Sequence, residues 1–178
     1  MKTGLRLFFL SILLFSLISC DTEDPFSIPP PDFSTVPEAY DTTGVESVEL
    51  KEGVKAYILD EGYGPFQATT RDRVSVFMTL RTADGEIIYS TFANENTDPI
   101  PVTMRDAGIT QNLFSYSILL SYTPGLKIGL LGIKEGEQRT LVVPPEQGYG
   151  NVSSNNVNAQ YREDTLIYDI RVSSINPK

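Results

Sequence analysis

The side chains that most often carry out chemistry in proteins are scarce in this sequence. Its 178 residues include no histidine and a single cysteine, Cys20. The missing histidine excludes Ser-His and Cys-His catalysis and most zinc sites, and one cysteine cannot form a disulfide framework. Nucleic acid is an unfavourable partner, because its phosphates require clustered Lys and Arg and the net charge is -9. We therefore expect no metal and no cofactor.

Cys20 stands at the end of a segment with the anatomy of a signal peptide. Lys2 and Arg6 precede an apolar run over residues 7–18, which is shorter than the ~20 residues of a membrane span. The run ends in Leu-Ile-Ser-Cys, which resembles the bacterial lipobox. This resemblance implies cleavage after residues 1–19 and stable anchoring through several acyl chains, palmitate among them, on Cys20. The alternative is an ordinary signal peptide in which the cysteine is incidental.

Residues 20–44 differ in composition from both the leader and the rest of the chain. Proline and acidic residues recur from residue 21 to residue 41, and no Lys or Arg occurs between the leader and Lys51. Such a segment cannot bury enough apolar surface to fold alone, and consecutive prolines favour an extended chain. We predict a lipid anchor followed by a semi-stiff spacer. The acidic run directly after Cys20 either resembles the tag that sends some Gram-negative lipoproteins to the cell surface or is ordinary solvated charge.

The elements that would position a site lie in residues 45–178. Alternating apolar residues predict strands over residues 54–59, 73–81, 86–92, 102–104, 137–143 and 164–173. The second and third of these strands form a hairpin around the turn Ala83-Asp84-Gly85.

One helix is predicted between these strands. Thr123 can cap its start and Pro124 suits its first turn. Leu126, Leu130 and Ile133 form a stripe that packs inward, and Lys134-Glu135-Gly136 ends the helix. Because no alternating βαβ units occur, the fold class is α+β, a twisted antiparallel sheet wrapped on one short helix.

Residues 123–150, TPGLKIGLLGIKEGEQRTLVVPPEQGYG, resemble the signature of FKBP-type peptidyl-prolyl cis-trans isomerases. The motifs in register are Gly125-Leu126, Gly129-Leu130, Gly136-Glu137, Pro144-Pro145-Glu146 and Tyr149-Gly150. The turn at residues 83–85 and the closing strand at residues 165–170 match as well. The resemblance covers roughly residues 45–175 and implies an FKBP-like fold.

The resemblance implies an isomerase of X-Pro bonds, which needs neither a nucleophile nor a metal. Such bonds interconvert unaided in about 10–100 s, and a catalyst must bind the twisted amide better than either planar form. Family members do so with an apolar groove between sheet and helix. We expect a folding helper, or chaperone, in the bacterial cell envelope, lipid-anchored at the outer membrane and facing the periplasm or the surface. Its partners would be the membrane and proline-containing segments of exported proteins, and it would be a monomer.

By resemblance the substrate groove comprises Tyr149, Tyr168, Tyr89, Ile88, Met78, Leu126, Ile100, Tyr122 and Thr123. Tyr149 matches the tyrosine that hydrogen-bonds the ligand's carbonyl. Tyr168 stands where the family has a phenylalanine, and Leu126 replaces the tryptophan of the groove floor. Tyr89 replaces an aspartate, and it could supply a hydroxyl or simply fill the groove. For the apolar members, a position in the hydrophobic core fits equally well.

Two loops depart from the family pattern. Between Met104 and Tyr122 the chain is roughly a dozen residues longer than in a minimal member, which is long for a plain connection. This insertion, at about residues 105–121, is apolar and either extends the peptide-binding surface or partly blocks the pocket. The loop over residues 151–164 is unusually polar for a flap over the groove. The alternative function is therefore a catalytically weak or inactive module that binds peptides or an envelope partner. A structural part of an envelope machine would differ mainly in having a fixed partner.

Overall fold

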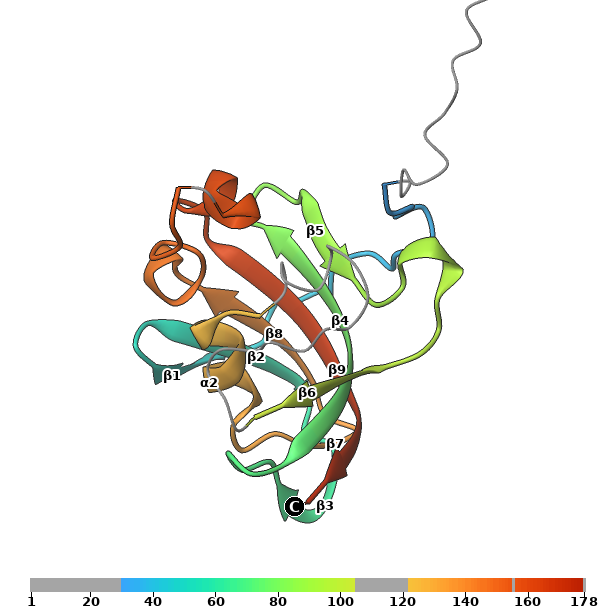
Figure 1. The fold of residues 1–178 in the computed structure, drawn as a ribbon. Helices are drawn as coiled ribbons and strands as arrows, with labels where there is room; N and C mark the ends of the chain where they lie inside the picture. Colours follow the sequence, from blue (N-terminus) through green and yellow to red (C-terminus); the bar gives the residue numbers. More distant parts are fainter. Residues whose placement is uncertain (1–29, 105–121, 155, 178) are drawn as a thin grey trace, which may run out of the picture. The chain divides into compact units, whose positions relative to one another are not determined.

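The computed structural model describes residues 30–104, 122–154 and 156–177, nearly all of which belong to one compact unit, Pro31–Lys178 (Figure 1). The predicted leader, the lipidation residue Cys20, the first part of the spacer and the insertion at 105–121 lie outside the described residues. Within the described residues, no helix is long and apolar enough to cross a membrane. The same part of the chain holds no cluster of acidic, histidine or cysteine side chains that could bind a metal ion.

The centre of the domain is a seven-stranded antiparallel sheet, ordered β1-β2-β8-β9-β4-β5, with β6 also paired to β4. Its strands are β1 (Ser47–Lys51), β2 (Val54–Asp60), β4 (Arg73–Thr82), β5 (Ile87–Ser90), β6 (Ile100–Thr103), β8 (Gln138–Val143) and β9 (Leu166–Asn176). A second, two-stranded sheet pairs β3 (Tyr63–Gln67) with β7 (Lys134–Glu135). The predicted strands are confirmed with shifted ends, whereas β1, β3 and β7 were not predicted. β5 and β6 pair with β4 at different positions along it, which leaves β5 as a terminal strand.

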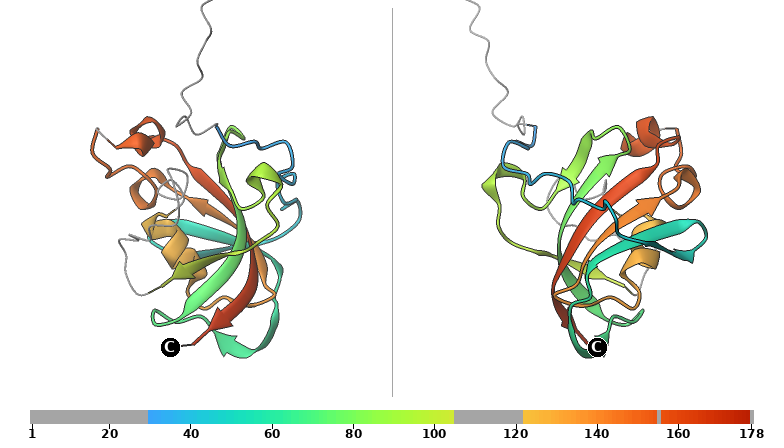
Figure 2. Two further views of the ribbon diagram at one scale, coloured as in Figure 1. Left: turned by 45° about the vertical axis from the view of Figure 1, so that its right-hand side comes forward. Right: turned by 180° about the vertical axis from the view of Figure 1, so that it is seen from behind.

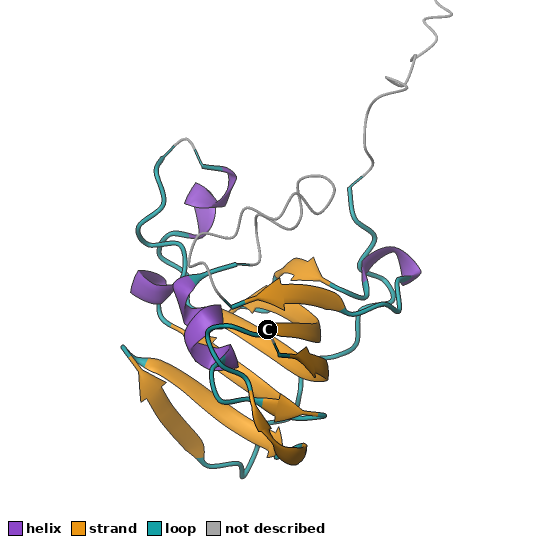
Figure 3. Cartoon of the chain, turned by 60° about the horizontal axis from the view of Figure 1, so that its bottom comes forward, coloured by secondary structure: helices purple, strands orange, loops and turns teal. Residues whose placement is uncertain are grey.

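One face of the sheet packs against helix α2 (Pro124–Leu130), as Figure 3 shows. The predicted start of the helix is confirmed: the side chain of Thr123 accepts a hydrogen bond from the backbone N–H of Leu126, and Pro124 occupies the first turn. The predicted end is wrong. The helix stops at Leu130, and Gly132 then adopts a positive φ of 76°, a conformation that favours glycine and terminates helices.

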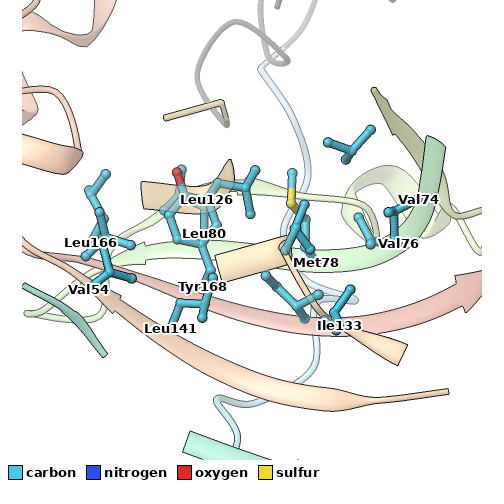
Figure 4. Close-up of a cluster of buried hydrophobic side chains, with 14 of the residues drawn as sticks. Val54, Val74, Val76, Met78, Leu80, Leu126, Ile133, Leu141, Leu166 and Tyr168 are labelled. Atoms are coloured by element: carbon cyan, nitrogen blue, oxygen red, sulfur yellow. The ribbon is translucent and has the colours of Figure 1, made fainter. Parts of the chain in front are cut away.

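The core lies between α2 and the sheet. Apolar side chains of β4, β8 and β9 converge on the helix (Figure 4): Met78, Leu80, Leu141 and Tyr168 lie beneath Leu126. All four alternating residues of β4, from Val74 to Leu80, are fully buried, which confirms the predicted period. Two helix glycines permit this close packing, because a Cβ at Gly125 or Gly129 would overlap the side chains of Val143 and Leu141 on β8.

The other face of the sheet is covered in part by residues 31–43, which we call the strap. Figure 2, right, which views the domain from behind, shows it crossing this face of the sheet before β1. Arg81 of β4 donates to Oδ2 of Asp169 on β9 (2.8 Å) and to the carbonyl oxygen of Pro37 in the strap (2.6 Å). The backbone N–H of Tyr40 also donates to Asp169 (3.3 Å). The predicted semi-stiff spacer was given as far as residue 44, whereas residues 31–43 belong to the compact unit, because a buried ion pair on the sheet binds the strap backbone.

Candidate active site

A cluster of hydroxyl groups lies where the start of α2 meets β9. Tyr168, near the start of β9, is fully buried. Its hydroxyl shares a hydrogen bond of 3.0 Å with Oγ1 of Thr123, and either oxygen can be the donor. Oγ1 of Thr123 also accepts the N–H of Leu126 at 3.1 Å. The residue that caps the helix thus joins the helix to the sheet.

Tyr149 belongs to the same cluster and has a different hydrogen-bonding state. It follows the short helix η3 (Pro145–Gln147), and its side chain is 2% exposed. Its hydroxyl forms no hydrogen bond of ordinary geometry with a described residue, although it lies near enough to the Tyr168 hydroxyl for a weak hydrogen bond that affects the pKa of both tyrosines. A buried polar group without a partner is rare and costly in folded proteins. Tyr149 is therefore a buried donor without a well-formed acceptor among the described residues.

The tyrosines of this region are held neutral. Burial raises the pKa of Tyr149, and the neighbouring hydroxyls of Tyr168 and Tyr161 raise it further. Burial also raises the pKa of Tyr168, although its hydrogen bonds oppose this effect. The pKa of Tyr122 rises to about 12 by burial, and that of Tyr89 rises through burial and then through Tyr122. The hydroxyls therefore remain protonated, and able to donate, at any physiological pH.

The structure brings the predicted groove residues into two groups. Tyr149, Tyr168, Thr123 and Leu126 form the first group, around the hydroxyl cluster, with Met78 beside them in the core (Figure 4). Met78 and Leu126 are buried, which agrees with the alternative prediction that they belong to the hydrophobic core. Their roles in substrate binding stay predictions.

The second group lies at the edge of the sheet. Ile88, Tyr89 and Ile100 line one hollow on the outer side of β5. Tyr122 is half-buried, and its hydroxyl donates to the carbonyl oxygen of Pro101 (3.4 Å). Tyr89 is 6% exposed and uncharged, so it brings no fixed negative charge to the site.

Sequence reasoning missed several residues that border these groups. Pro31 and Phe33 of the strap form a wall of the hollow beside β5. Their proline-rich surroundings predicted a spacer, and no local sequence pattern indicates that they pack against the sheet. Arg81 and Asp169, which hold the strap, did carry a signal, because each is a charged residue inside a predicted strand of largely uncharged residues. Charges in such positions need a partner when both faces of the sheet are covered.

Comparison with known proteins identifies the fold. A family model described as FKBP-type peptidyl-prolyl cis-trans isomerase matches residues 64–173. Similar solved structures include FkpA from Escherichia coli, with 22% identity and a TM-score of 0.54 over 76% of this chain and 53% of that one. A peptidyl-prolyl cis-trans isomerase from Pseudomonas syringae pv. tomato shares 22% identity, with a TM-score of 0.52 over 73% of this chain and 80% of that one.

A third similar structure is the N-terminal domain of FKBP42 from Arabidopsis thaliana. It shares 21% identity, with a TM-score of 0.55 over 80% of this chain and 98% of that one. The chain thus spans about half the length of the Escherichia coli protein and nearly all of the plant domain. At these identities the structures establish the FKBP-like fold alone. A search of curated proteins found no significant match.

Proposed function

The chain belongs to the family of FKBP-type peptidyl-prolyl cis-trans isomerases, and from this membership we propose that it isomerises X-Pro bonds in exported proteins. The observation that carries the proposal is the buried hydroxyl of Tyr149, which has no well-formed partner among the described residues. A substrate carbonyl would supply the missing acceptor. The hydroxyl is the donor that the resemblance assigns to the substrate carbonyl.

The chemistry asked of this site is the rotation of an amide. The barrier of ~18–20 kcal/mol arises from the partial double bond between carbon and nitrogen. Planar amides are charge-separated, and an apolar wall such as Met78 and Leu126 disfavours that separation relative to water. A hydrogen bond from Tyr149 would fix the carbonyl while the nitrogen pyramidalises. Catalysis then follows if this arrangement binds the twisted amide better than the planar one.

The proposed setting is the bacterial envelope, where a lipid on Cys20 would anchor the chain as a monomer. Ten residues, 21–30, separate Cys20 from the strap, and a chain of that length spans at most about 36 Å. The domain would then act on clients close to the membrane surface. Whether that surface faces the periplasm or the exterior is decided by protease access on intact cells.

A direct assay tests the enzyme proposal. The full-length chain, purified in detergent, is added to a peptide whose X-Pro bond starts in cis, and the rate of conversion to trans is measured. We expect acceleration proportional to enzyme concentration. A rate equal to the uncatalysed one, from a protein shown to be folded by its circular dichroism, would overturn the proposal.

One observation favours a second function, a peptide-binding module without catalysis. Tyr89 is buried and neutral, whereas by resemblance its position carries the fixed negative charge of the groove. If that charge is required for catalysis, the protein would bind X-Pro peptides without accelerating their isomerisation. Fluorescence anisotropy with a labelled X-Pro peptide, measured beside the rate assay, separates the two functions.

A further inference from the structure

A hollow of about 290 Å³ lies between the strap and β5, and we call it the edge hollow. Pro31 and Phe33 of the strap form one wall. Ile88, Tyr89 and Ile100 line it from the sheet side. None of Tyr149, Tyr168 and Leu126 lines it, whereas Ile88, Tyr89 and Ile100 also belong to the groove that the resemblance assigns, so the edge hollow joins the strap to one end of that predicted groove.

The backbone next to the edge hollow can pair with another chain. β5 is the last strand in the order of the large sheet, and its outer side has no strand partner within the described residues. Ser90 and Thr91, at the end of β5, also line the hollow. An open strand edge is a template for an extended peptide, which gains main-chain hydrogen bonds and places alternate side chains into neighbouring pockets.

The strap wall is held in place by specific contacts. The backbone N–H of Asp32 donates to Oδ1 of Asn94, and the N–H of Asn94 donates to the carbonyl oxygen of Asp32, both at 2.8 Å. The hydroxyl of Thr35 donates to the carbonyl oxygen of Phe92, also at 2.8 Å. Asn94 takes a φ of +56°, a left-handed conformation that Asn adopts more readily than most residues with a side chain. These contacts fix the position of Phe33 between them.

The size and chemistry of the edge hollow indicate what it would bind. Its volume is at the lower end of ligand pockets, which begin at about 300 Å³, and this excludes a large cofactor. None of its described lining residues is charged: Phe33, Ile88 and Ile100 supply apolar surface, and Ser90, Thr91, Asn94 and Asn96 add neutral polar groups. A neutral, apolar side chain therefore fits better than a phosphate or a charged group.

We propose that the edge hollow is an accessory subsite for an aromatic or large aliphatic side chain of the client, a few residues from the proline. The client segment pairs along β5 in extended form, while its X-Pro bond lies at Tyr149. This inference rests on the proposed function, because it assumes that a peptide occupies the groove. The strap, a part of the tether, then helps to select the client.

The test is a binding series on the full-length chain in detergent. Labelled peptides carry one X-Pro bond and a single phenylalanine moved through successive positions on both sides of it, with alanine as the reference. We expect one position at which phenylalanine binds about tenfold tighter than alanine, the effect of burying one aromatic side chain. Phe33→Ser, which opens the hollow, and Ala93→Phe, which fills it, should each abolish that preference and leave the alanine peptide unchanged.

Two controls make the result specific. Val36→Ser changes a half-buried strap residue that does not line the hollow, and it should keep the full preference. If the preference persists in both Phe33→Ser and Ala93→Phe, or if no position prefers phenylalanine, the subsite proposal is overturned. Because binding is measured without turnover, a positional preference in a chain that fails the rate assay would support the subsite and reject the enzyme.

Discussion

Replacing Tyr149 by phenylalanine should change stability and activity in opposite directions. The substitution removes one oxygen atom from a side chain that is 2% exposed and whose hydroxyl lacks a well-formed partner among the described residues. A buried hydroxyl without a partner costs about 1–3 kcal/mol. We therefore expect Tyr149→Phe to raise the free energy of unfolding by about 1 kcal/mol. In a chain of this size that corresponds to an increase in Tm of about 2–4 °C.

The same substitution removes the donor proposed for the substrate carbonyl. The loss of one hydrogen bond that forms in the transition state, about 1–1.5 kcal/mol, lowers kcat/KM about tenfold. Tyr168→Phe is the informative contrast, because its hydroxyl is bonded to Thr123. That variant should lose about 1 kcal/mol of stability. Tyr63→Phe, at a side chain 64% exposed, should change neither quantity.

Thermal unfolding followed by circular dichroism and the cis-to-trans assay together decide the matter. A Tyr149→Phe variant that is less stable than the parent by 1 kcal/mol or more would mean that the hydroxyl is satisfied in the folded protein. A variant that isomerises as fast as the parent would refute the role of Tyr149 in catalysis. Only the combination of higher stability and lower activity agrees with a donor kept free for substrate.

Three further predictions test the frame around the site. Gly129→Ala should lower the unfolding free energy by about 1–3 kcal/mol through overlap with Leu141, measured by urea denaturation, whereas Lys127→Ala should stay within about 0.5 kcal/mol. Asp169→Ala leaves Arg81 buried without its partner, which should lower the unfolding free energy by about 3–5 kcal/mol. The strap should then become accessible to protease. The double variant with Arg81→Met should recover part of the lost stability. Burial raises the pKa of Tyr122 to about 12 in the folded protein, whereas the pKa of an unfolded tyrosine is about 10. Above about pH 10 the unfolded state therefore binds fewer protons than the folded state. The unfolding midpoint should then be flat from about pH 6 to 9 and fall above pH 10, and activity should be equally flat over the lower range.

The parts of the domain that sequence predicts well are those set by local patterns. The alternation along β4 depends only on the period of a strand, and Thr123 before Pro124 is a capping signal contained in neighbouring residues. The end of α2 was misplaced because a left-handed Gly132 stops the helix before the charged residues that looked like its end. Strands β3 and β7 form only through each other, and neither has a repeating pattern of its own.

The candidate site shows the same division. The positions of Tyr149 and Tyr168 followed from motif spacing, but the hydrogen bond between Tyr168 and Thr123 joins residues 45 positions apart and leaves no mark in either local sequence. The packing of the strap against the sheet is even harder to predict from local sequence. Its proline-rich composition excludes regular structure, but it does not exclude binding to a surface whose buried Arg81 needs an acceptor.

β9 links the tether to the candidate site. Successive residues of a strand face opposite sides of the sheet, so Asp169 accepts hydrogen bonds from the strap side while its neighbour Tyr168 lies in the hydroxyl cluster. The same strand therefore holds the end of the tether and the wall of the groove. Because the strap is bonded to Asp169 and to Asn94, the groove keeps a constant orientation relative to Pro31. The strap and the hydroxyl cluster lie on opposite faces of the sheet, so a client in the groove would meet the strap at the sheet edge, where Pro31 and Phe33 line the edge hollow beside β5.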